Sequence, residues 1–295
     1  MKSTQQLTRA MKFVAAVKLR RAQEGVFAAR PYARGILRVL RSATARIENP
    51  THPLLERRPE EKILALVLTG DRSLCGAFNT NVIRRAVEFL RRNEKHKVQL
   101  VAIGKRGRDS LKKRGFGFAG EYLYVSDRVE FARAKEIAAR VAELYTTGEA
   151  DAVYTIYNEF KNVLIQRLQV EKILPLSPEL IVAGKTEEEE PREHGAALPV
   201  QPAAAGTMML VDYIYEQPPE QIFNGLLPRY LEAEIFRVLL ESSAAEHAAR
   251  MTAMDSATNN AADLIEQLTL QMNKIRQASI TKEILEVVSG AEALR

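Results

Sequence analysis

Residues 229–289 read RYLEAEIFRVLLESSAAEHAARMTAMDSATNNAADLIEQLTLQMNKIRQASITKEILEVVS, a run of 61 residues without a glycine or a proline. Part of this run alternates steps of three and four residues, the spacing of a coiled-coil seam. A helix of about 60 residues is about 90 Å long, whereas ordinary helices have about a dozen residues. We therefore predict a helix that mostly projects from the rest of the chain. The predicted seam consists of Ala244, His247, Met251, Met254, Thr258, Ala261, Ile265, Leu268, Met272, Ile275 and Ser279.

The N-terminal residues predict a partner for this helix. Residues 3–47 are rich in helix formers, and Gly25 and Pro31 predict a bend or irregularity within them. Leu7, Met11 and Val14 continue the seam spacing, so we expect the two terminal helices to pair antiparallel.

The middle of the chain alternates short apolar runs with helical segments, which indicates an α/β layer with a largely parallel sheet. Helices are expected at 79–92 and 128–145, and a short helix or loop at 105–114. Strands are expected at 63–68, 98–103, 122–125, 152–157, 163–174 and 208–215. The fold class is α/β, with a central Rossmann-like domain and a long antiparallel two-helix coiled coil.

These elements divide the chain into three parts. An N-terminal coiled-coil helix occupies 1–58, the central α/β domain 59–217 and a C-terminal coiled-coil helix 218–295. Residues 186–206 contain EEEEP and QPAAAG, which predict a mobile acidic insertion.

Composition limits the class of protein. The chain has 295 residues, 46% of them hydrophobic, and no stretch approaches the apolar length that spans a bilayer. No secretory signal is visible at the N-terminus, and the single cysteine, Cys75, excludes an intrachain disulfide. We therefore expect a reducing cytosolic compartment.

Positive charge is concentrated in the N-terminal helix. The net charge is +6, and residues 1–46 carry eleven lysines and arginines against one acid, Glu24. This pattern fits a nucleic-acid or anionic-membrane surface, a solvated helix face, or a surface for an acidic protein partner.

The candidate catalytic and ligand motifs are weak. TGDRSLCGAFNTN at 69–81 follows a strand and precedes a helix, but lacks the P-loop and dinucleotide patterns, so a structural turn is favoured. In it, Asp71 is expected to cap locally and Asn79 to N-cap the next helix. Cys75 has no patterned base nearby and is expected to be a packed thiol, and the four histidines form no metal-ligand cluster. The basic stretch 104–117 is expected to be a surface loop.

Several longer segments resemble a known family, the gamma subunits of F-type ATP synthases. They are AMKFVAAVKLRRAQE at 10–24, GDRSLCGAFNTN at 70–81, YNEFKN at 157–162, ESSAAEHAARMTAMDSATNNA at 241–261 and RQASITKEILEVVSGAEAL at 276–294. The resemblance covers nearly the whole chain. It implies an asymmetric shaft of two antiparallel helices with an α/β domain at its foot.

The resemblance also implies a function and partners. The chain would be the non-catalytic rotor that couples proton flow to ATP synthesis or hydrolysis, and it would help to regulate activity. Its partners would be three alpha and three beta subunits, an epsilon subunit and the membrane c-ring, at the cytoplasmic face of a bacterial plasma (inner) membrane. No cofactor, metal or nucleic acid is implied, and membrane association would arise only through the complex. Residues matching the family's coupling and partner contacts are Met11, Lys12, Lys18, Arg20, Arg21, Arg250, Gln277 and Thr281.

Two features depart from the family pattern. Family members usually begin further upstream, so we expect either an earlier native start or a shortened helix. The acidic insertion is the second departure. Alternatives that remain open are a nucleotide-binding α/β enzyme with helical arms, and a basic coiled coil that binds nucleic acid or anionic lipid.

Overall fold

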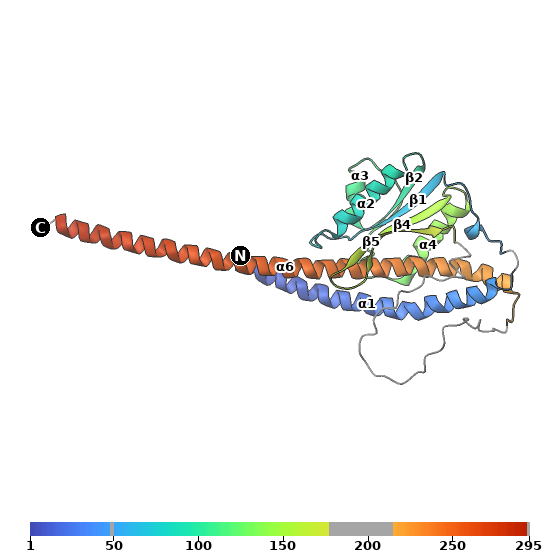
Figure 1. Ribbon diagram of the computed structural model, residues 1–295, viewed down its shortest axis with the longest axis horizontal. Coiled ribbons are helices and arrows are strands. Elements are labelled where there is room, and N and C mark those ends of the chain that lie inside the picture. Colours follow the sequence, from blue (N-terminus) through green and yellow to red (C-terminus); the bar gives the residue numbers. More distant parts are fainter. Residues whose placement is uncertain (48–49, 177–214, 294–295) are drawn as a thin grey trace, which may run out of the picture.

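Two long terminal helices dominate the computed structural model, which describes residues 1–47, 50–176 and 215–293. Helix α1 spans Lys2–Thr44 and helix α6 spans Pro219–Ala293. They lie side by side and antiparallel, and α6 continues well beyond the N-terminus of α1 (Figure 1). We call these two helices the shaft. Both helices run on through an internal proline, Pro31 and Pro228 respectively.

Small residues bring the two shaft helices together. Ala15 and Leu19 of α1 are buried, and Leu19 packs against Ala244 and Ala248 of α6. Gly25 faces α6 so closely that an added Cβ would lie 3.1 Å from Leu240 Cδ2. The pairing therefore depends on side chains small enough for the backbones to approach.

The predicted seam of α1 is wrong by about one position. Leu7 and Val14 are 56% and 58% exposed, whereas Met11 is half-buried. The helix is rotated so that Ala15 and Leu19 face α6, because this face carries the small residues that close packing requires.

The predicted seam of α6 is confirmed in its first half only. Ala244, His247, Met254 and Ala261 are buried, and Met251, Thr258 and Ile265 are half-buried. Beyond that point Leu268, Met272, Ile275 and Ser279 are exposed, because α6 continues there past the N-terminus of α1 (Figure 1). We call residues 266–293 the tip; as a single helix it extends about 40 Å.

The α/β unit that lies against the shaft runs from Pro53 to Leu176, and we call it the foot. It begins with a short 3₁₀ helix, η1 (Pro53–Leu55). Its helices are α2 (Phe78–Arg92), α3 (Lys105–Lys112) and α4 (Phe131–Thr146). Its strands are β1 (Lys62–Leu68), β2 (Lys97–Ile103), β3 (Phe118–Tyr122), β4 (Ala152–Phe160) and β5 (Gln166–Leu174).

The strands form one sheet in the order β3-β2-β1-β4-β5. The first four are parallel, and β5 pairs antiparallel with β4 at one edge. The order of the parallel strands reverses between β1 and β4, as in doubly wound dinucleotide-binding folds. This confirms the predicted Rossmann-like domain.

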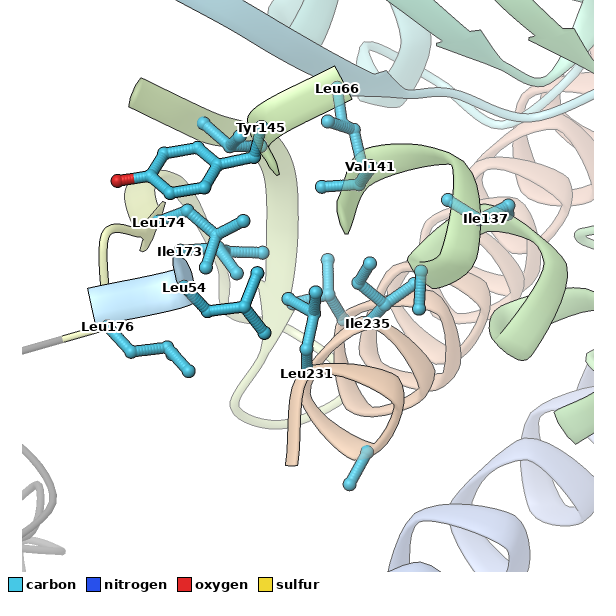
Figure 2. Packing of buried hydrophobic residues seen from close by; sticks show 14 of the residues in the cluster. Leu54, Leu66, Ile137, Val141, Tyr145, Ile173, Leu174, Leu176, Leu231 and Ile235 are labelled. Carbon is cyan, nitrogen blue, oxygen red and sulfur yellow. The ribbon is translucent and has the colours of Figure 1, made fainter. Parts of the chain in front are cut away.

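Apolar side chains at alternate positions of β1 pack into two hydrophobic cores, one on each face of the sheet. Leu64, Leu66 and Leu68 face α4, α6 and η1, while Ala65 and Val67 face α2 and α3. Figure 2 shows part of the first core, where labelled side chains of η1, α4 and α6 meet beside the sheet. The shaft helix α6 is therefore one of the layers of the foot.

Some predicted boundaries differ from the structure. The third strand is Phe118–Tyr122 rather than 122–125, because Tyr124 has a φ of 59° and its N–H donates to the Asp71 carboxylate instead of a strand. The stretch 105–114, predicted to be a short helix or a loop, contains helix α3. The predicted strand at 208–215 and the insertion at 186–206 lie outside the described residues, except that Tyr215 is described and is not in a strand.

Candidate functional site: the shaft and its junction with the foot

Loops at the carboxyl edge of the parallel strands gather around Asp71. Its Oδ1 accepts hydrogen bonds from the N–H groups of Lys105 and Tyr124, at 2.9 and 3.0 Å. Its Oδ2 accepts from the Ser126 hydroxyl at 3.0 Å. Asp71 therefore holds the first turn of α3 and the loop after β3, rather than capping its own turn as predicted.

The turn between β1 and α2 is closed by Asn79. The side-chain oxygen of Asn79 accepts from the Gly70 N–H at 2.8 Å, and its amide donates to the Arg72 carbonyl at 3.2 Å. Asn79 lies inside α2, whose N-cap is Ala77, so the predicted N-cap role of Asn79 is wrong. The predicted structural turn is confirmed.

Cys75 lies in the same turn and packs against the shaft. It is 2% exposed and belongs to a cluster with Phe78 and Ala245. Burial raises the pKa of the thiol, and the nearby Glu246 acts in the same direction. A buried, protonated thiol is a packing group.

Helix α6 contributes a buried carboxylate to this junction. Glu246 is 2% exposed, and its Oε1 accepts from the Arg250 guanidinium at 2.6 Å. Burial raises the pKa of the Glu246 carboxyl, and the charge of Arg250 opposes that rise. An added Cβ on Gly70 would lie 2.6 Å from Glu246 Cδ, so this carboxyl group rests against the turn after β1.

His247 is buried one residue further along. Burial, with the positive charges of Arg250 and Lys18, lowers the pKa of His247 to about 4, although Asp127 acts in the opposite direction. The imidazole is therefore neutral at pH 7.

A second ionic cluster joins α6 to the antiparallel edge of the sheet. The Arg237 guanidinium bonds Glu171 of β5 at 3.1 Å, and Glu234 and Glu241 of its own helix at 2.8 and 3.1 Å. It also lies 3.3 Å from the Tyr157 hydroxyl of β4. Although burial works against its charge, the carboxylates of Glu234 and Glu241 hold the pKa of Arg237 above its ordinary value.

The predicted contact residues fall into separate groups on the shaft. Lys12 Nζ is paired with Asp255 of α6 at 2.6 Å, and Lys18 Nζ with Asp127 of the foot at 2.7 Å. Two members of the predicted basic stripe therefore form ion pairs within the chain, one with α6 and one with the foot.

The other predicted residues are more accessible, apart from Arg250. Arg20 and Arg21 are exposed on α1, and Arg20 pairs with Glu24 at 3.0 Å. Gln277 and Thr281 are exposed on the tip, where the Thr281 hydroxyl donates to the Gln277 carbonyl at 2.9 Å. Arg250, with 15% of its side chain exposed, is held by Glu246.

Sequence reasoning missed Glu246 and Arg237. The available signal for Glu246 was its position, since it is a charged residue among the small and seam residues of α6 and directly precedes His247. For Arg237 the available signal was the spacing from Glu234 and Glu241, three and four residues away.

Within the described residues, no group of histidine, cysteine and acidic side chains could hold a metal ion. No helix in that part of the chain is long and apolar enough to cross a membrane.

One cavity of about 310 Å³ lies at the C-terminal end of β5 and is lined by Arg57, Arg58, Glu60, Lys172 and Pro175. Lys172 and Glu60 are paired there at 2.5 Å, and Arg58 is paired with Glu56.

The geometry thus defines a class of protein: an α/β foot packed against a shaft of two long antiparallel helices. A family model described as ATP synthase matches residues 1–294. The ATP synthase gamma chain of Solibacter usitatus is 47% identical over 296 residues, covering 99% of this chain and 94% of the relative. That of Pelotomaculum thermopropionicum is 44% identical over 293 residues, covering 99% and 95%.

A solved structure shares the same arrangement. The central stalk and c-ring structure of the Tetrahymena thermophila mitochondrial ATP synthase matches with a TM-score of 0.58 and 25% identity, covering 85% of this chain and 99% of that chain. The chain belongs to the ATP synthase gamma-chain family, whose members form the non-catalytic central stalk of the rotary complex.

Proposed function

We propose that this chain turns inside a ring of three alpha and three beta subunits, with its foot on an epsilon subunit and the membrane c-ring. The complex would lie at the cytoplasmic face of a bacterial plasma membrane, with this subunit peripheral to it. The division into 1–58, 59–217 and 218–295 then separates one shaft helix, a central domain that contains most of the foot, and the second shaft helix.

The asymmetry of the shaft carries this proposal. The shaft consists of two antiparallel helices, and the foot lies against one side of them (Figure 1). A rod without rotational symmetry contacts three equivalent sites differently at each angle. Only such a difference in contact free energy can favour one conformation at one site over the others.

The predicted contact residues take distinct roles in this arrangement. Arg20 and Arg21 face outward on α1 and suit acidic loops of the beta subunits. Exposed ion pairs are worth about 0–1 kcal/mol, so such contacts can break at every step of rotation. Gln277 and Thr281 would contact the inner wall of the ring near the end of the shaft.

The remaining four residues are partly committed within the chain. Lys12 is paired with Asp255, Lys18 with Asp127 and Arg250 with Glu246, and Met11 is half-buried. We propose that these residues act in coupling through the shape of the shaft as well as by direct contact.

Reconstitution tests the proposal. The full chain is mixed with the matching alpha and beta subunits, and co-elution and ATP hydrolysis are measured. We expect a complex with one gamma chain to three of each partner, and loss of activity when residues after Gln277 are removed. The control variant Lys282→Ala changes an exposed tip residue that is paired with Glu286, and it should retain activity. Failure of the full chain to assemble with folded partners would refute the proposal.

A further inference from the structure

The ligand crevice of this α/β fold is filled by the chain's own shaft. In open α/β sheets, ligands bind outside the carboxyl ends of the strands, where the strand order reverses. Here that point lies between β1 and β4. Ala245 of α6 packs there against Cys75 of the turn after β1 and Phe78, the first residue of α2, and Phe160 at the end of β4 packs against the same cluster. The shaft therefore stands where a doubly wound enzyme would hold its ligand.

The segment of α6 in the crevice is built for close approach. Residues 242–249 read SSAAEHAA, and Ser242, Ser243, Ala244, Ala245 and Ala248 are buried. The Ser243 hydroxyl donates to the Ser126 carbonyl at 2.8 Å, which ties the helix to the loop after β3. Small side chains let the helix backbone lie against the loops, and the two large side chains that this segment buries are Glu246 and His247.

Glu246 is the one long charged side chain that this segment directs into the foot. Its carboxyl group lies against Gly70, close enough that a Cβ there would come within 2.8 Å of both carboxylate oxygens. Arg250 holds the carboxylate from one side at 2.6 Å. Rotation of α6 toward the turn would drive this group into the turn backbone, which is costly, and Arg250 would move with it because it lies on the same helix.

We infer that Glu246 is a positioning residue for coupling, which fixes the rotational register of α6 on the foot by seating its carboxylate against Gly70. This inference rests on the proposed rotor function. Torque applied to the foot passes to the shaft at this contact as well as through the apolar layer of α6. A larger residue at position 70 would take the space that the carboxylate now occupies.

Steric exchange between the two residues tests the contact directly. Gly70→Ala, Glu246→Ala and the double variant are compared by denaturant unfolding of the full chain. Each single change should raise the equilibrium constant for unfolding, because one adds a clash and the other leaves a cavity and removes the partner of Arg250. The equilibrium constant for unfolding of the double variant should be about tenfold smaller than the product of the two single effects would give. Gly225→Ala is the matched control, since nothing lies within 4 Å of its added Cβ.

The functional readout uses the reconstituted complex. With the alpha and beta ring immobilised, the angular spread of a bead on the foot is recorded during catalytic pauses. Glu246→Ala should widen this spread about twofold while ATP hydrolysis persists, because the ring contacts lie on the shaft. Glu246→Gln keeps the shape of the side chain and should retain a narrow spread. If Gly70→Ala does not fold, this pair of variants still tests the inference.

The outcomes separate the two proposals. If the wild-type chain does not assemble, the rotor function fails. If it assembles and rotates, but Glu246→Ala gives the wild-type spread, or Gly70→Ala and Glu246→Ala are additive, the inference about Glu246 is overturned.

Discussion

Replacement of Arg237 by alanine should loosen the foot from the shaft. The guanidinium is the centre of a cluster that contains Glu171, Glu234 and Glu241, and it also meets the Tyr157 hydroxyl. Two of the three carboxylates are on the same helix, so the cross-element contacts are those with β4 and β5. Removal of the cation leaves three carboxylates close together without its positive charge.

The magnitude follows from burial. Breaking a fully buried ion pair from one side costs about 3–5 kcal/mol. The Arg237 side chain is 26% exposed, so water can solvate part of the charge left behind. We therefore expect the free energy of unfolding to fall by about 2–3 kcal/mol. Lysine at this position keeps the charge but not the planar fork of donors, and should give an intermediate loss.

Denaturant unfolding of the full chain measures this loss, and hydrogen exchange locates it. Exchange should accelerate in β4 and β5 more than in β2, since only the former contact Arg237. The control is Arg140→Ala, which breaks an exposed pair with Glu143 and should cost less than about 1 kcal/mol. An equal loss in the two variants would refute the reasoning.

Three further predictions follow from contrasts within the structure. Leu19→Ala should lower the free energy of unfolding by about 2–4 kcal/mol, because Leu19 is buried between the two shaft helices. Leu7 is exposed, so Leu7→Ala should lower it by less than about 0.5 kcal/mol. Equal losses would contradict the packing described for α1. Gly104→Ala should destabilise the foot by more than about 4 kcal/mol, since the added Cβ would lie 2.0 Å from the Thr69 carbonyl oxygen. Gly115 also has a positive φ, but nothing lies within 4 Å of an added Cβ, so Gly115→Ala should cost about 1–3 kcal/mol. Thermal melts of the two variants measure this difference. The native pKa of about 4 for His247 is below its unfolded value of about 6.5, so the unfolded state binds the extra proton and stability falls as pH drops through this window. Unfolding at pH 7 and pH 5 should show a loss about 2 kcal/mol larger for the wild type than for His247→Gln, and parallel losses would exclude this role.

The long helices and the parallel sheet could be predicted because their signals are repetitive. The apolar run of β1 and the spacing in α6 are each repeated over many residues. The seam of α1 was predicted from Leu7 and Val14, the larger side chains, but the contact is made by Ala15 and Gly25, whose value is their small size. Size complementarity belongs to a pair of helices and is not visible in one of them.

The missed elements were those that depend on distant partners. Strand β3 contains Gly120, which disfavours a strand in isolation, yet at the sheet edge it pairs with β2. Glu246 and Arg237 are ordinary charged helix residues until the foot is placed beside α6. The family resemblance supplied positions for the contacts of the shaft, but not the pairing of Lys12, Lys18 and Arg250 within the chain.

The antiparallel pairing of the two ends of the chain also sets an order of folding. Thr8 meets Thr258 and Lys12 meets Asp255, contacts that join residues 250 and 243 positions apart. During synthesis α1 is made first, yet its partner leaves the ribosome last. The strands and helices between β1 and β4 can associate earlier, because their contacts are closer in sequence. The shaft is therefore the last part to form, and its first helix must wait with Leu19 and its neighbours uncovered until α6 arrives.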